Sequence, residues 1–568
     1  MDFGDYQVKL PELLKALRKG ETVVELGDGS YGLVPEQIIQ NYGFLLNAGT
    51  ANGDHVVFHR TQTGLLDAIL ASREEIAVDA VFTAARDRLR AFDSIPAVDQ
   101  PVGFKGVLRH YQREGVAWMQ FLREFGFGGC LADDMGVGKT PQVLAVLETR
   151  RKLRSLNEPI GPSLVVVPRS LIYNWKQEAA KFTPKLRILE HSGVDRTRDI
   201  AEFSKYDVVL TTYGTLRRDA VLLQNCEFDY VVLDEANAIK NIGSESAKAA
   251  RIIRGKHRLV MTGTPVENHL GELCSLFEFL NPGMLSGFSA MLGGASLRNP
   301  DDASRELLGR AVRPFILRRT KEQVASELPK KLEQTIYCEL DADERRRYND
   351  LRDHYRKALL SQVERQGIAK SKMHVLEALL RLRQAACHSG LLDGKLKEKP
   401  SSKTETLLEQ LSEIADEGHK ALVFSQFTSL LDIVRKQLDG TGLTYEYLDG
   451  STRDRQARVE RFQSDADCRL FLISLKAGGV GLNLTAADYV FLLDPWWNPA
   501  VESQAIDRTH RIGQTRPVFA YRLIARDTIE EKVLQLQDSK RNLADAIIRA
   551  DTNLVRDLKR EDLDFLFS

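Results

Sequence analysis

Short runs of apolar residues, each bounded by polar or turn-forming residues, recur along the chain in two groups. The first group comprises residues 129–132, 164–168, 207–212, 229–235 and 258–263. The second comprises residues 421–425, 470–474, 489–494 and 518–523. Continuous apolar runs of this length are typical of strands buried on both faces of a parallel sheet, and helical patterns lie between them. The pattern predicts an α/β chain with two doubly wound parallel-sheet lobes.

The segments outside these groups carry different patterns. Residues 21–35 predict a hairpin around Gly27 to Ser30, followed by helical segments, which indicates a small N-terminal accessory domain. Thr528 and Glu531 form a capping-box pattern, so a helix is expected after the last strand. The predicted domains are residues 1–100 (accessory), 101–281 (first lobe), 282–400 (mostly helical insertions and linker), 401–545 (second lobe) and 546–568 (tail).

Composition narrows the class of protein. The chain has 568 residues, of which 43% are hydrophobic and 28% charged, so it holds enough apolar material for more than one core and is not mainly disordered. Lys+Arg and Asp+Glu both number 79, so nucleic-acid binding would need a local basic surface. The apolar runs are far shorter than the roughly 18 residues that span a bilayer, and the N-terminus carries no secretion signal.

The cysteines agree with an intracellular location. Six cysteines lie far apart without a CxxC pair, which argues against a zinc module and a disulfide framework. A reducing compartment is therefore expected, namely the cytoplasm, with association to the nucleoid if the chain is bacterial.

A candidate phosphate loop, LADDMGVGKT, occupies residues 131–140. Such a loop binds polyphosphate through successive main-chain N–H groups, a helix N-terminus and one lysine, while a hydroxyl reaches Mg²⁺. Gly136, Gly138, Lys139 and Thr140 supply these parts, but Asp133 stands where a glycine is usual. By itself the triplet is equally compatible with a glycine turn followed by a solvated lysine.

An acidic pair, Asp234 and Glu235, follows the predicted strand at residues 229–235. Open α/β sheets place ligand chemistry at the carboxyl ends of their strands. One carboxylate can then hold the metal while the next orients or deprotonates water. Alone, such a pair is as often a helix cap. A phosphate loop and an acidic pair in one predicted sheet favour a nucleotide site.

Arg508 and Arg511 lie three residues apart near the end of the second lobe. This spacing places both guanidinium groups on one face of a turn, where they can act as arginine fingers toward a γ-phosphate. The alternative is a surface ion-pair cluster of little energetic weight.

The ordered motifs from about residue 104 to residue 540 resemble the Snf2 family of superfamily 2 helicase-like ATPases. The matching stretches include LRHYQREGVAWM, LADDMGVGKT, LVVVPRSLIYNWKQE, LDEANAIKN, LVMTGTPVEN, RPFILRRTKEQVASELPKK, SSKTETLLE, ALVFSQFTSLLD, SLKAGGVGLNLTAAD and DPWWNPAVESQAIDRTHRIGQ. The resemblance implies two RecA-like lobes that clamp ATP and bind DNA. It also implies that Asp133 is a family feature of the loop.

The resemblance assigns roles at the ATP site. Nucleotide contacts are implied for Gln112, Asp133, Asp134, Met135, Gly136, Val137, Gly138, Lys139, Thr140 and Gln504, with Gln112 reading adenine and Gln504 acting as a sensor. Thr140 and Asp234 would bind Mg²⁺, and Thr262 and Thr264 would couple hydrolysis to movement of the lobes. The implied catalytic residues are Lys139, Asp234, Glu235, Arg508 and Arg511.

The resemblance also implies contacts with the backbone of double-stranded DNA, without sequence specificity. The implied residues are Arg169, Ser170, Asn174, Thr211, Thr212, Ser425, Gln426, Lys476, Gly478 and Trp497. Trp497 is equally compatible with packing inside the lobe. A basic run, Arg313, Arg318, Arg319 and Lys321, would face DNA or the other lobe, although such runs more commonly form a solvated helix face.

One departure from the family pattern affects the acidic pair. Asn237 stands where the family usually has Gln or His, which leaves open how the base communicates with Thr262. The resulting interpretation is a DNA-stimulated Mg²⁺-ATP hydrolase that translocates on double-stranded DNA and displaces or remodels bound protein. The alternatives are a strand-separating helicase and an ATP-controlled scaffold that binds DNA without hydrolysis.

Overall fold

The computed structural model divides the chain into two compact units. Unit 1 comprises residues 1–134 and 138–320, and unit 2 comprises residues 135–137 and 321–568. The described residues are 2–3, 6–8, 13, 22–34, 50–52, 55–70, 78–90, 95–156, 160–264, 270–285, 302–325, 327–478, 482–497 and 499–535. The predicted tail at residues 546–568 and parts of the predicted accessory domain lie outside them.

Unit 1 contains a sheet of seven strands among its described residues, in the order β13-β7-β12-β11-β8-β10-β9. The bounds are β7 Gly129–Leu131, β8 Ser163–Val167, β9 Ile188–His191, β10 Val208–Thr212, β11 Phe228–Asp234, β12 Gly255–Met261 and β13 Ile316–Leu317. All of its pairings are parallel. The apolar runs at 129–132, 164–168, 207–212, 229–235 and 258–263 thus correspond to five of these strands.

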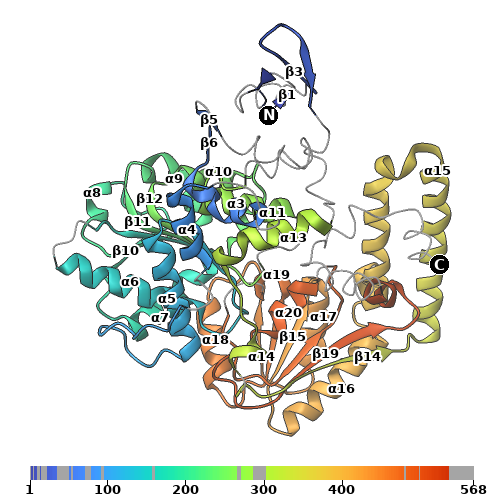
Figure 1. The fold of residues 1–568 in the computed structure, drawn as a ribbon. Coiled ribbons are helices and arrows are strands. Elements are labelled where there is room, and N and C mark those ends of the chain that lie inside the picture. The colour runs from blue at the N-terminus through green and yellow to red at the C-terminus, as the bar shows by residue number, and fades with distance from the viewer. Residues whose placement is uncertain are drawn as a thin grey trace. The chain divides into compact units, whose positions relative to one another are not determined.

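Helices cover this sheet in two layers (Figure 1). One layer consists of α5 His110–Glu124, α6 Lys139–Ser155 and α7 Ile172–Phe182, and the other of α9 Tyr213–Leu223, α10 Glu245–Ile252 and α11 Leu270–Leu280. Alternate strand residues such as Leu164, Val166 and Leu233 pack with the second helix layer in one buried cluster. Burial on both faces is the reason why the central strands are apolar without alternation.

Strand β13 comes from the range predicted to hold helical insertions and a linker. Ile316 pairs with Cys130 and Leu317 with Leu131, so β13 extends the sheet beside β7. The indole Nε1 of Trp118 donates to the carbonyl of Pro314 at 2.9 Å and fastens the same segment to α5. A strand of two residues is too short to give an apolar run, so sequence periodicity did not reveal it.

Unit 2 contains a parallel sheet of six strands among its described residues, in the order β14-β19-β18-β15-β17-β16. The bounds are β14 Lys331–Cys338, β15 Ala421–Ser425, β16 Tyr445–Leu448, β17 Leu470–Ser474, β18 Tyr489–Leu492 and β19 Val518–Ala525. The four predicted strands are present. Strand β14 was missed because, as an edge strand with several exposed positions, it lacks a continuous apolar run.

The helices of unit 2 complete its layers. They include α15 Ala342–Cys387, α16 Ser402–Asp416, α17 Thr428–Leu438, α18 Arg455–Ser464, α19 Leu475–Gly478 and α20 Pro499–Ile506. Residues of α16 and α17 share one buried cluster with alternate residues of β15, β17 and β18, whereas α18 and α20 pack into a second cluster on the other residues of these strands. The predicted helix near Thr528 is present and begins at Ile529, with the carboxylate of Glu531 accepting from the N–H of Asp527 at 2.9 Å.

The N-terminal hairpin is confirmed. Strands β3 Val23–Glu25 and β4 Tyr31–Leu33 pair antiparallel across the predicted turn. Farther along, α3 Thr63–Leu70 packs on α13 Asp302–Val312, where a Cβ at Gly64 would lie 2.8 Å from the carbonyl oxygen of Ala311.

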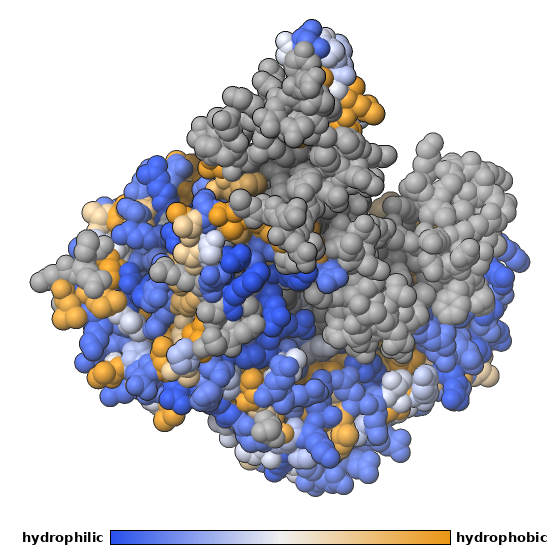
Figure 2. Space-filling view, viewed as in Figure 1, coloured by the Kyte–Doolittle hydropathy of each residue, from blue (hydrophilic) through white to orange (hydrophobic). Residues whose placement is uncertain are grey.

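The described surface is mostly hydrophilic on the face drawn in Figure 2, with apolar residues scattered over it. Within the described residues, none of the helices combines the length and apolar character needed to cross a membrane.

Candidate active site

The ends of three strands lie level at the carboxyl edge of the unit 1 sheet. Asp234 at the end of β11 pairs with Met261 of β12, which in turn pairs with Leu131 of β7. The phosphate loop, the acidic pair and the Thr262 turn follow directly after these strands. The structure therefore brings together the unit 1 motifs that the sequence predicted at one edge.

Lys139 is the first residue of α6, and its side chain folds back over the loop. Its ammonium Nζ donates to the carbonyl oxygens of Asp133 at 2.7 Å and Asp134 at 3.3 Å. Thr140 follows in the first turn of the helix, where main-chain N–H groups lack intrahelical partners. This is the arrangement of charge and N–H donors that a polyphosphate requires.

Gly138 is needed both for its backbone and for its missing side chain. Its φ of 83° lies in the left-handed region that favours glycine. A Cβ there would lie 2.5 Å from Nε2 of Gln112, the residue implied to read adenine. The Oε1 atom of Gln112 accepts from the N–H of Arg109 at 3.0 Å, which holds the amide against the loop.

Asp133, the acidic residue that replaces the usual glycine, is fully buried. Its Oδ1 accepts from Nε of Arg319 at 3.0 Å and its Oδ2 from Nη2 at 2.6 Å. The Nε2 atom of Gln142 also donates to Oδ2, at 3.2 Å. The carboxylate is thus satisfied inside unit 1, so any contact of Asp133 with nucleotide would be made by its main chain.

Arg319 is a functional candidate that the sequence motifs did not assign to the ATP site. The basic run that contains it was interpreted as a surface that faces DNA, the other lobe or solvent. Instead, Arg319 lies across the base of the loop, 5.1 Å from the ring centre of Tyr111. The available signal was an acid in the loop without a local partner, and only the fold shows which arginine meets it.

Asp234 is buried at the strand end and receives two N–H donors. The indole Nε1 of Trp175 donates to Oδ2 at 2.8 Å, and the main-chain N–H of Glu235 donates to Oδ1 at 2.9 Å. Burial, together with the negative charge of Glu235, raises the pKa of Asp234 to about 7, while the ammonium of Lys139 acts in the opposite direction. A bound divalent cation favours the ionised carboxylate.

Glu235 has a backbone conformation that is unusual for its residue type. Its φ of 47° and ψ of 58° lie in the left-handed region, which costs a residue with a side chain about 1 kcal/mol or more. The hydroxyl of Tyr213 donates to the carbonyl oxygen of Asp234 at 2.8 Å and fixes the peptide just before it. The strained backbone at the end of β11 sets the direction of the Glu235 side chain.

Asn237 retains a link between the acidic pair and the threonine turn. The hydroxyl of Thr262 lies 3.4 Å from Oδ1 of Asn237 and donates to the carbonyl of Thr264 at 3.2 Å. The N–H of Thr264 donates back to the Thr262 hydroxyl at 3.1 Å. The family departure at Asn237 therefore leaves a polar path between the two motifs.

The oxygen donors of this edge fit Mg²⁺ bound together with a nucleotide. Asp234 offers a carboxylate and Thr140 a hydroxyl, and Mg²⁺ is commonly held by one or two such groups plus substrate phosphates. Within the described ranges, no group of three or more His, Cys, Asp or Glu is arranged to hold a metal. The donor set is that of a cation held largely by the nucleotide.

The second-lobe candidates lie in unit 2. Gln504 lies on α20, Arg508 is buried, and Nε of Arg511 donates to the carbonyl of Asp507 at 3.3 Å. The carboxylate of Asp507 is paired with Nζ of Lys321 at 2.6 Å. The action of Arg508 and Arg511 as arginine fingers stays a prediction.

Two unit 1 candidates for DNA contact use their hydroxyls internally. Thr211 is buried and donates to the carbonyl of His191 at 2.7 Å, and the hydroxyl of Thr212 caps α9 by accepting from the N–H of Thr215 at 3.1 Å. Arg169 is exposed, whereas Ser170 and Asn174 are half-buried. Contact with DNA stays a prediction for all five implied residues, among which Arg169 is an exposed cation.

Two unit 2 candidates, Ser425 and Gln426, contact Asp494, which is fully buried. The hydroxyl of Ser425 donates to Oδ1 at 2.6 Å and the amide of Gln426 to Oδ2 at 2.5 Å. Arg383 of α15, a residue absent from the motif-based list, is ion-paired with Oδ2 at 3.5 Å and lies 5.6 Å from the ring centre of Trp497. Trp497 is thus partly packed inside unit 2, the alternative to DNA contact that the sequence left open.

Lys476 and Gly478 lie on α19, and the side chain of Lys476 falls outside the described part of the chain. Their contact with DNA stays a prediction.

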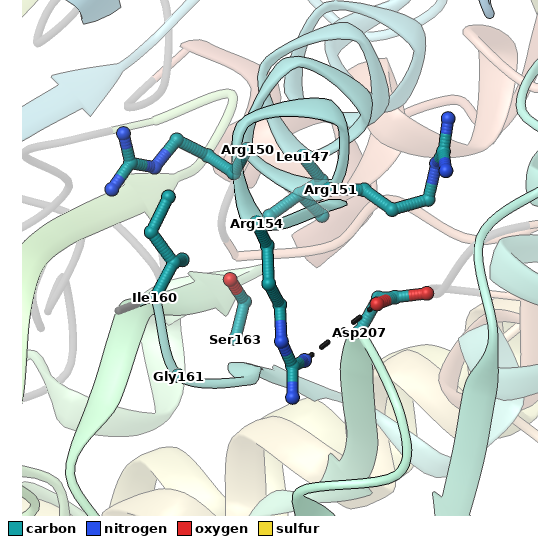
Figure 3. A pocket seen from close by; sticks show the side chains of 8 residues that line it. All are labelled: Leu147, Arg150, Arg151, Arg154, Ile160, Gly161, Ser163 and Asp207. Carbon is teal, nitrogen blue, oxygen red and sulfur yellow. Dashed lines mark ion pairs between the residues drawn. The ribbon is translucent and has the colours of Figure 1, made fainter. Parts of the chain in front are cut away.

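A small pocket lies at the opposite edge of the unit 1 sheet (Figure 3). Its lining residues are Leu147, Arg150, Arg151, Arg154, Ile160, Gly161, Ser163 and Asp207. Ser163 begins β8 and Asp207 precedes β10, which places the pocket at the amino ends of the strands. The arginines are engaged by unit 1 acids: Arg150 with Asp229 at 2.7 Å, Arg151 with Glu148 at 2.7 Å and Arg154 with Asp207 at 3.6 Å. It is not the nucleotide site.

Comparison with known families covers both units. The SNF2-related domain family matches residues 111–391, and the helicase conserved C-terminal domain family matches residues 402–513. A protein of Mycoplasma pneumoniae described as an uncharacterized ATP-dependent helicase is 35% identical over 568 residues, which cover 98% of this chain and 54% of that protein. The putative ATP-dependent helicase/translocase YwqA of Bacillus subtilis is 37% identical over 503 residues, which cover 85% of this chain and 53% of that protein.

The chain spans about half the length of these curated relatives. Among solved structures, the SWI2/SNF2 ATPase core of Sulfolobus solfataricus in complex with double-stranded DNA is 36% identical, with a TM-score of 0.40, and the match covers 82% of this chain and 98% of that one.

Proposed function

Because this chain belongs to the SNF2 family of helicase-like ATPases, we propose that it hydrolyses Mg²⁺-ATP and uses the energy to move along double-stranded DNA. The work is displacement or remodelling of protein–DNA complexes. The contacts are with the DNA backbone and carry no base specificity. This role would place the protein in the cytoplasm, at the nucleoid if the chain is bacterial.

The observation that carries the proposal is the level row of strand ends in unit 1. It places the loop that ends in Lys139, the Asp234–Glu235 pair and the Thr262 turn at one edge. Phosphoryl transfer requires mainly positioned groups and stabilisation of negative charge, because there is little covalent chemistry for the protein to perform. The edge supplies both.

Each group has a part in the proposed reaction. Lys139 and the main-chain N–H groups of the loop bind the phosphates. Thr140 and Asp234 would hold Mg²⁺, which would supply positive charge against the phosphate oxygens. Glu235 orients and deprotonates the attacking water. Arg508 and Arg511 are assigned to the transferred phosphoryl group as arginine fingers.

The proposal that DNA is the track rests on the family and on the similarity to YwqA, a putative helicase/translocase. Since the chain has no net charge, the attraction to DNA must come from local cations such as Arg169. A contact surface of this kind loses affinity steeply as salt rises, because counterions are no longer released with the same gain.

Phosphate release tests the ATPase. Hydrolysis should be stimulated by duplex DNA more than by single-stranded DNA or RNA, and the stimulation should fall steeply with salt. The Lys139→Ala variant should lose hydrolysis at least a hundredfold, because phosphate positioning and charge stabilisation go together. Unchanged hydrolysis in that variant would overturn the assignment of the site.

A second assay separates translocation from unwinding. A translocase should displace a third strand or a bound protein from duplex DNA and leave the duplex paired. Release of single strands would instead identify a strand-separating helicase, and binding of DNA without phosphate release would identify a scaffold.

A further inference from the structure

We propose that Arg319 and Lys321, one on each side of Thr320, are positioning residues that couple the phosphate loop to the segment that carries Arg508 and Arg511. The inference rests on the proposed function, because it gives both side chains a part in ATP turnover. Neither residue is assigned to the reacting atoms. Each acts through an acid, Arg319 through Asp133 and Lys321 through Asp507.

On the unit 1 side, three hydrogen bonds join the segment before Thr320 to the start of the loop. The N–H of Ala132 donates to the carbonyl of Leu317 at 2.7 Å, and the N–H of Asp134 donates to the carbonyl of Arg319 at 3.0 Å. Between them, the N–H of Arg319 donates to Oδ1 of Asp133 at 3.1 Å. The loop therefore begins as a continuation of the β7–β13 pairing.

The Arg319 guanidinium also fixes the orientation of Asp133. It binds the Asp133 carboxylate in a bidentate arrangement, which fixes the angle between the two groups as well as their distance. Its Nη2 also donates to Oε1 of Gln142 at 3.1 Å. The carbonyl of Asp133 is one of the two acceptors of Lys139, so rotation of Asp133 moves an acceptor of the phosphate-binding lysine.

Gly115 leaves the space that the Arg319 guanidinium and the Gln142 amide occupy. A Cβ on Gly115 of α5 would lie 1.9 Å from Oε1 of Gln142 and 3.0 Å from Nη2 of Arg319. The guanidinium side chain is only 12% exposed and Asp133 is buried. Burying the two charges of this ion pair costs desolvation free energy, so the pair contributes little net stability. Its main effect is to fix the geometry of the two side chains.

On the unit 2 side, Lys321 braces the turn around Arg508. Its buried Nζ lies 2.6 Å from Oδ1 of Asp507 and donates to the carbonyl of His510 at 2.5 Å. These two contacts lie immediately before Arg508 and immediately before Arg511. One lysine thus contacts the residue that precedes each of the two proposed fingers.

The contacts of Arg319 and of Lys321 lie on either side of Thr320, at one of the places where the chain passes between the units. Unit 1 ends with Thr320 and the long segment of unit 2 begins with Lys321. Thr320 joins two side chains that are each ion-paired with an acid, Arg319 with Asp133 and Lys321 with Asp507, so the backbone of Thr320 links the two pairs directly. A change in the phosphate loop is thereby passed to the finger segment through three residues.

A purely structural role predicts a different outcome from a positioning role. If the pairs only hold the units folded, their loss lowers the melting temperature and leaves ATP affinity and turnover of the folded fraction unchanged. If Arg319 positions the loop, its loss raises the KM for ATP. If Lys321 positions the finger segment, its loss lowers kcat with DNA while KM changes little.

Nucleotide binding and phosphate release in matched variants separate these outcomes. Arg319→Gln should raise both the KM and the Kd for ATP about tenfold, and Arg319→Lys nearly as much, because an ammonium cannot reproduce the two-pronged grip. Lys321→Met should lower the DNA-stimulated kcat about tenfold, and Lys321→Arg should restore most of it. Lys185→Gln is the control, since Lys185 is an exposed cation that belongs to neither pair and to none of the implied sites.

The Asp133→Asn/Arg319→Gln double variant removes both buried charges and guards against a folding defect. It should regain the melting temperature lost in Arg319→Gln and still bind ATP weakly. Full recovery of ATP affinity in the double variant would overturn the positioning role of Arg319. A wild-type protein that hydrolyses ATP while Arg319→Gln and Lys321→Met match Lys185→Gln would overturn the inference alone. A wild-type protein that binds no ATP would overturn the proposed function with it.

Discussion

Two aspartates at strand ends, one in each unit, share a local sequence pattern and have different surroundings. Asp234 ends β11 after the run VVL, and Asp494 follows β18 after the run VFLL. Both side chains are buried. Asp234 accepts from the N–H groups of Trp175 and Glu235, which are neutral donors. Asp494 is ion-paired with Arg383 and also accepts from Ser425 and Gln426.

The difference shows that a strand-end acid has no fixed role. Burial raises the pKa of both carboxyl groups. At Asp234 the remaining demand for positive charge can be met by a cation bound with the nucleotide. At Asp494 the protein meets it with Arg383, so the carboxylate becomes a fixed anchor for the loop that holds Ser425 and Gln426. Whether a distant element supplies a cation, as α15 supplies Arg383 to Asp494, therefore decides whether the strand-end acid is a structural anchor or is open to a bound cation.

Replacing Asp234 with Asn should have the largest effect of the variants that test this contrast. The amide cannot supply the negative charge that Mg²⁺ requires, so DNA-stimulated phosphate release should fall about a thousandfold, equivalent to about 4 kcal/mol. The urea midpoint should stay the same or rise, because a buried carboxylate is removed. Hydrolysis above one tenth of the wild-type rate would contradict the metal role of Asp234.

Replacing Asp494 with Asn should show the reverse profile. Arg383 is left buried without its countercharge, and the free energy of unfolding should fall by about 3 kcal/mol. Urea unfolding followed by tryptophan fluorescence measures the loss. The KM for ATP should change little, since the partners of Asp494 are Arg383, Ser425 and Gln426 and not residues of the phosphate loop. A lost ATP affinity with unchanged stability would reverse the comparison.

The Arg383→Met/Asp494→Leu double variant sharpens the same point. Apolar replacement of both partners removes the two desolvation costs together, so the double variant should recover about 1 to 2 kcal/mol relative to the less stable single variant. The same urea titration supplies the four free energies of the cycle. Strictly additive losses would show that Arg383 and Asp494 do not interact.

Tyr213→Phe should have the smallest effect. It tests whether the Tyr213 hydroxyl fixes the peptide between Asp234 and Glu235. The variant loses the hydrogen bond from the tyrosine hydroxyl to the Asp234 carbonyl, worth about 1 kcal/mol. We expect kcat to fall by a few-fold while the KM for ATP stays constant, because the direction of Glu235 changes and the phosphate loop does not. Steady-state phosphate release at saturating DNA measures both constants.

Local sequence was sufficient for the features that depend on neighbouring residues. Runs such as LVVV in β8 specify a buried parallel strand because every side chain must be apolar when both faces are covered. The hairpin around Gly27 and the helix start at Thr528 belong to this class. The loop that ends in Lys139 and the acid pair at Asp234 were each ambiguous alone, and their occurrence together in one predicted sheet favoured a nucleotide site.

Long-range partners were decided by the tertiary structure alone. Strands β13 and β14 lack an apolar run, and the first adds to the sheet through main-chain hydrogen bonds that any sequence can make. Arg319 had been interpreted as surface charge until the fold placed it on Asp133, and Arg383 carried no signal at all. Pairing between residues far apart in the chain depends on which elements become neighbours, and no periodicity records that choice. The sequence therefore determined the two sheets and their reactive edges, whereas only the folded chain determined which acids remain open to chemistry.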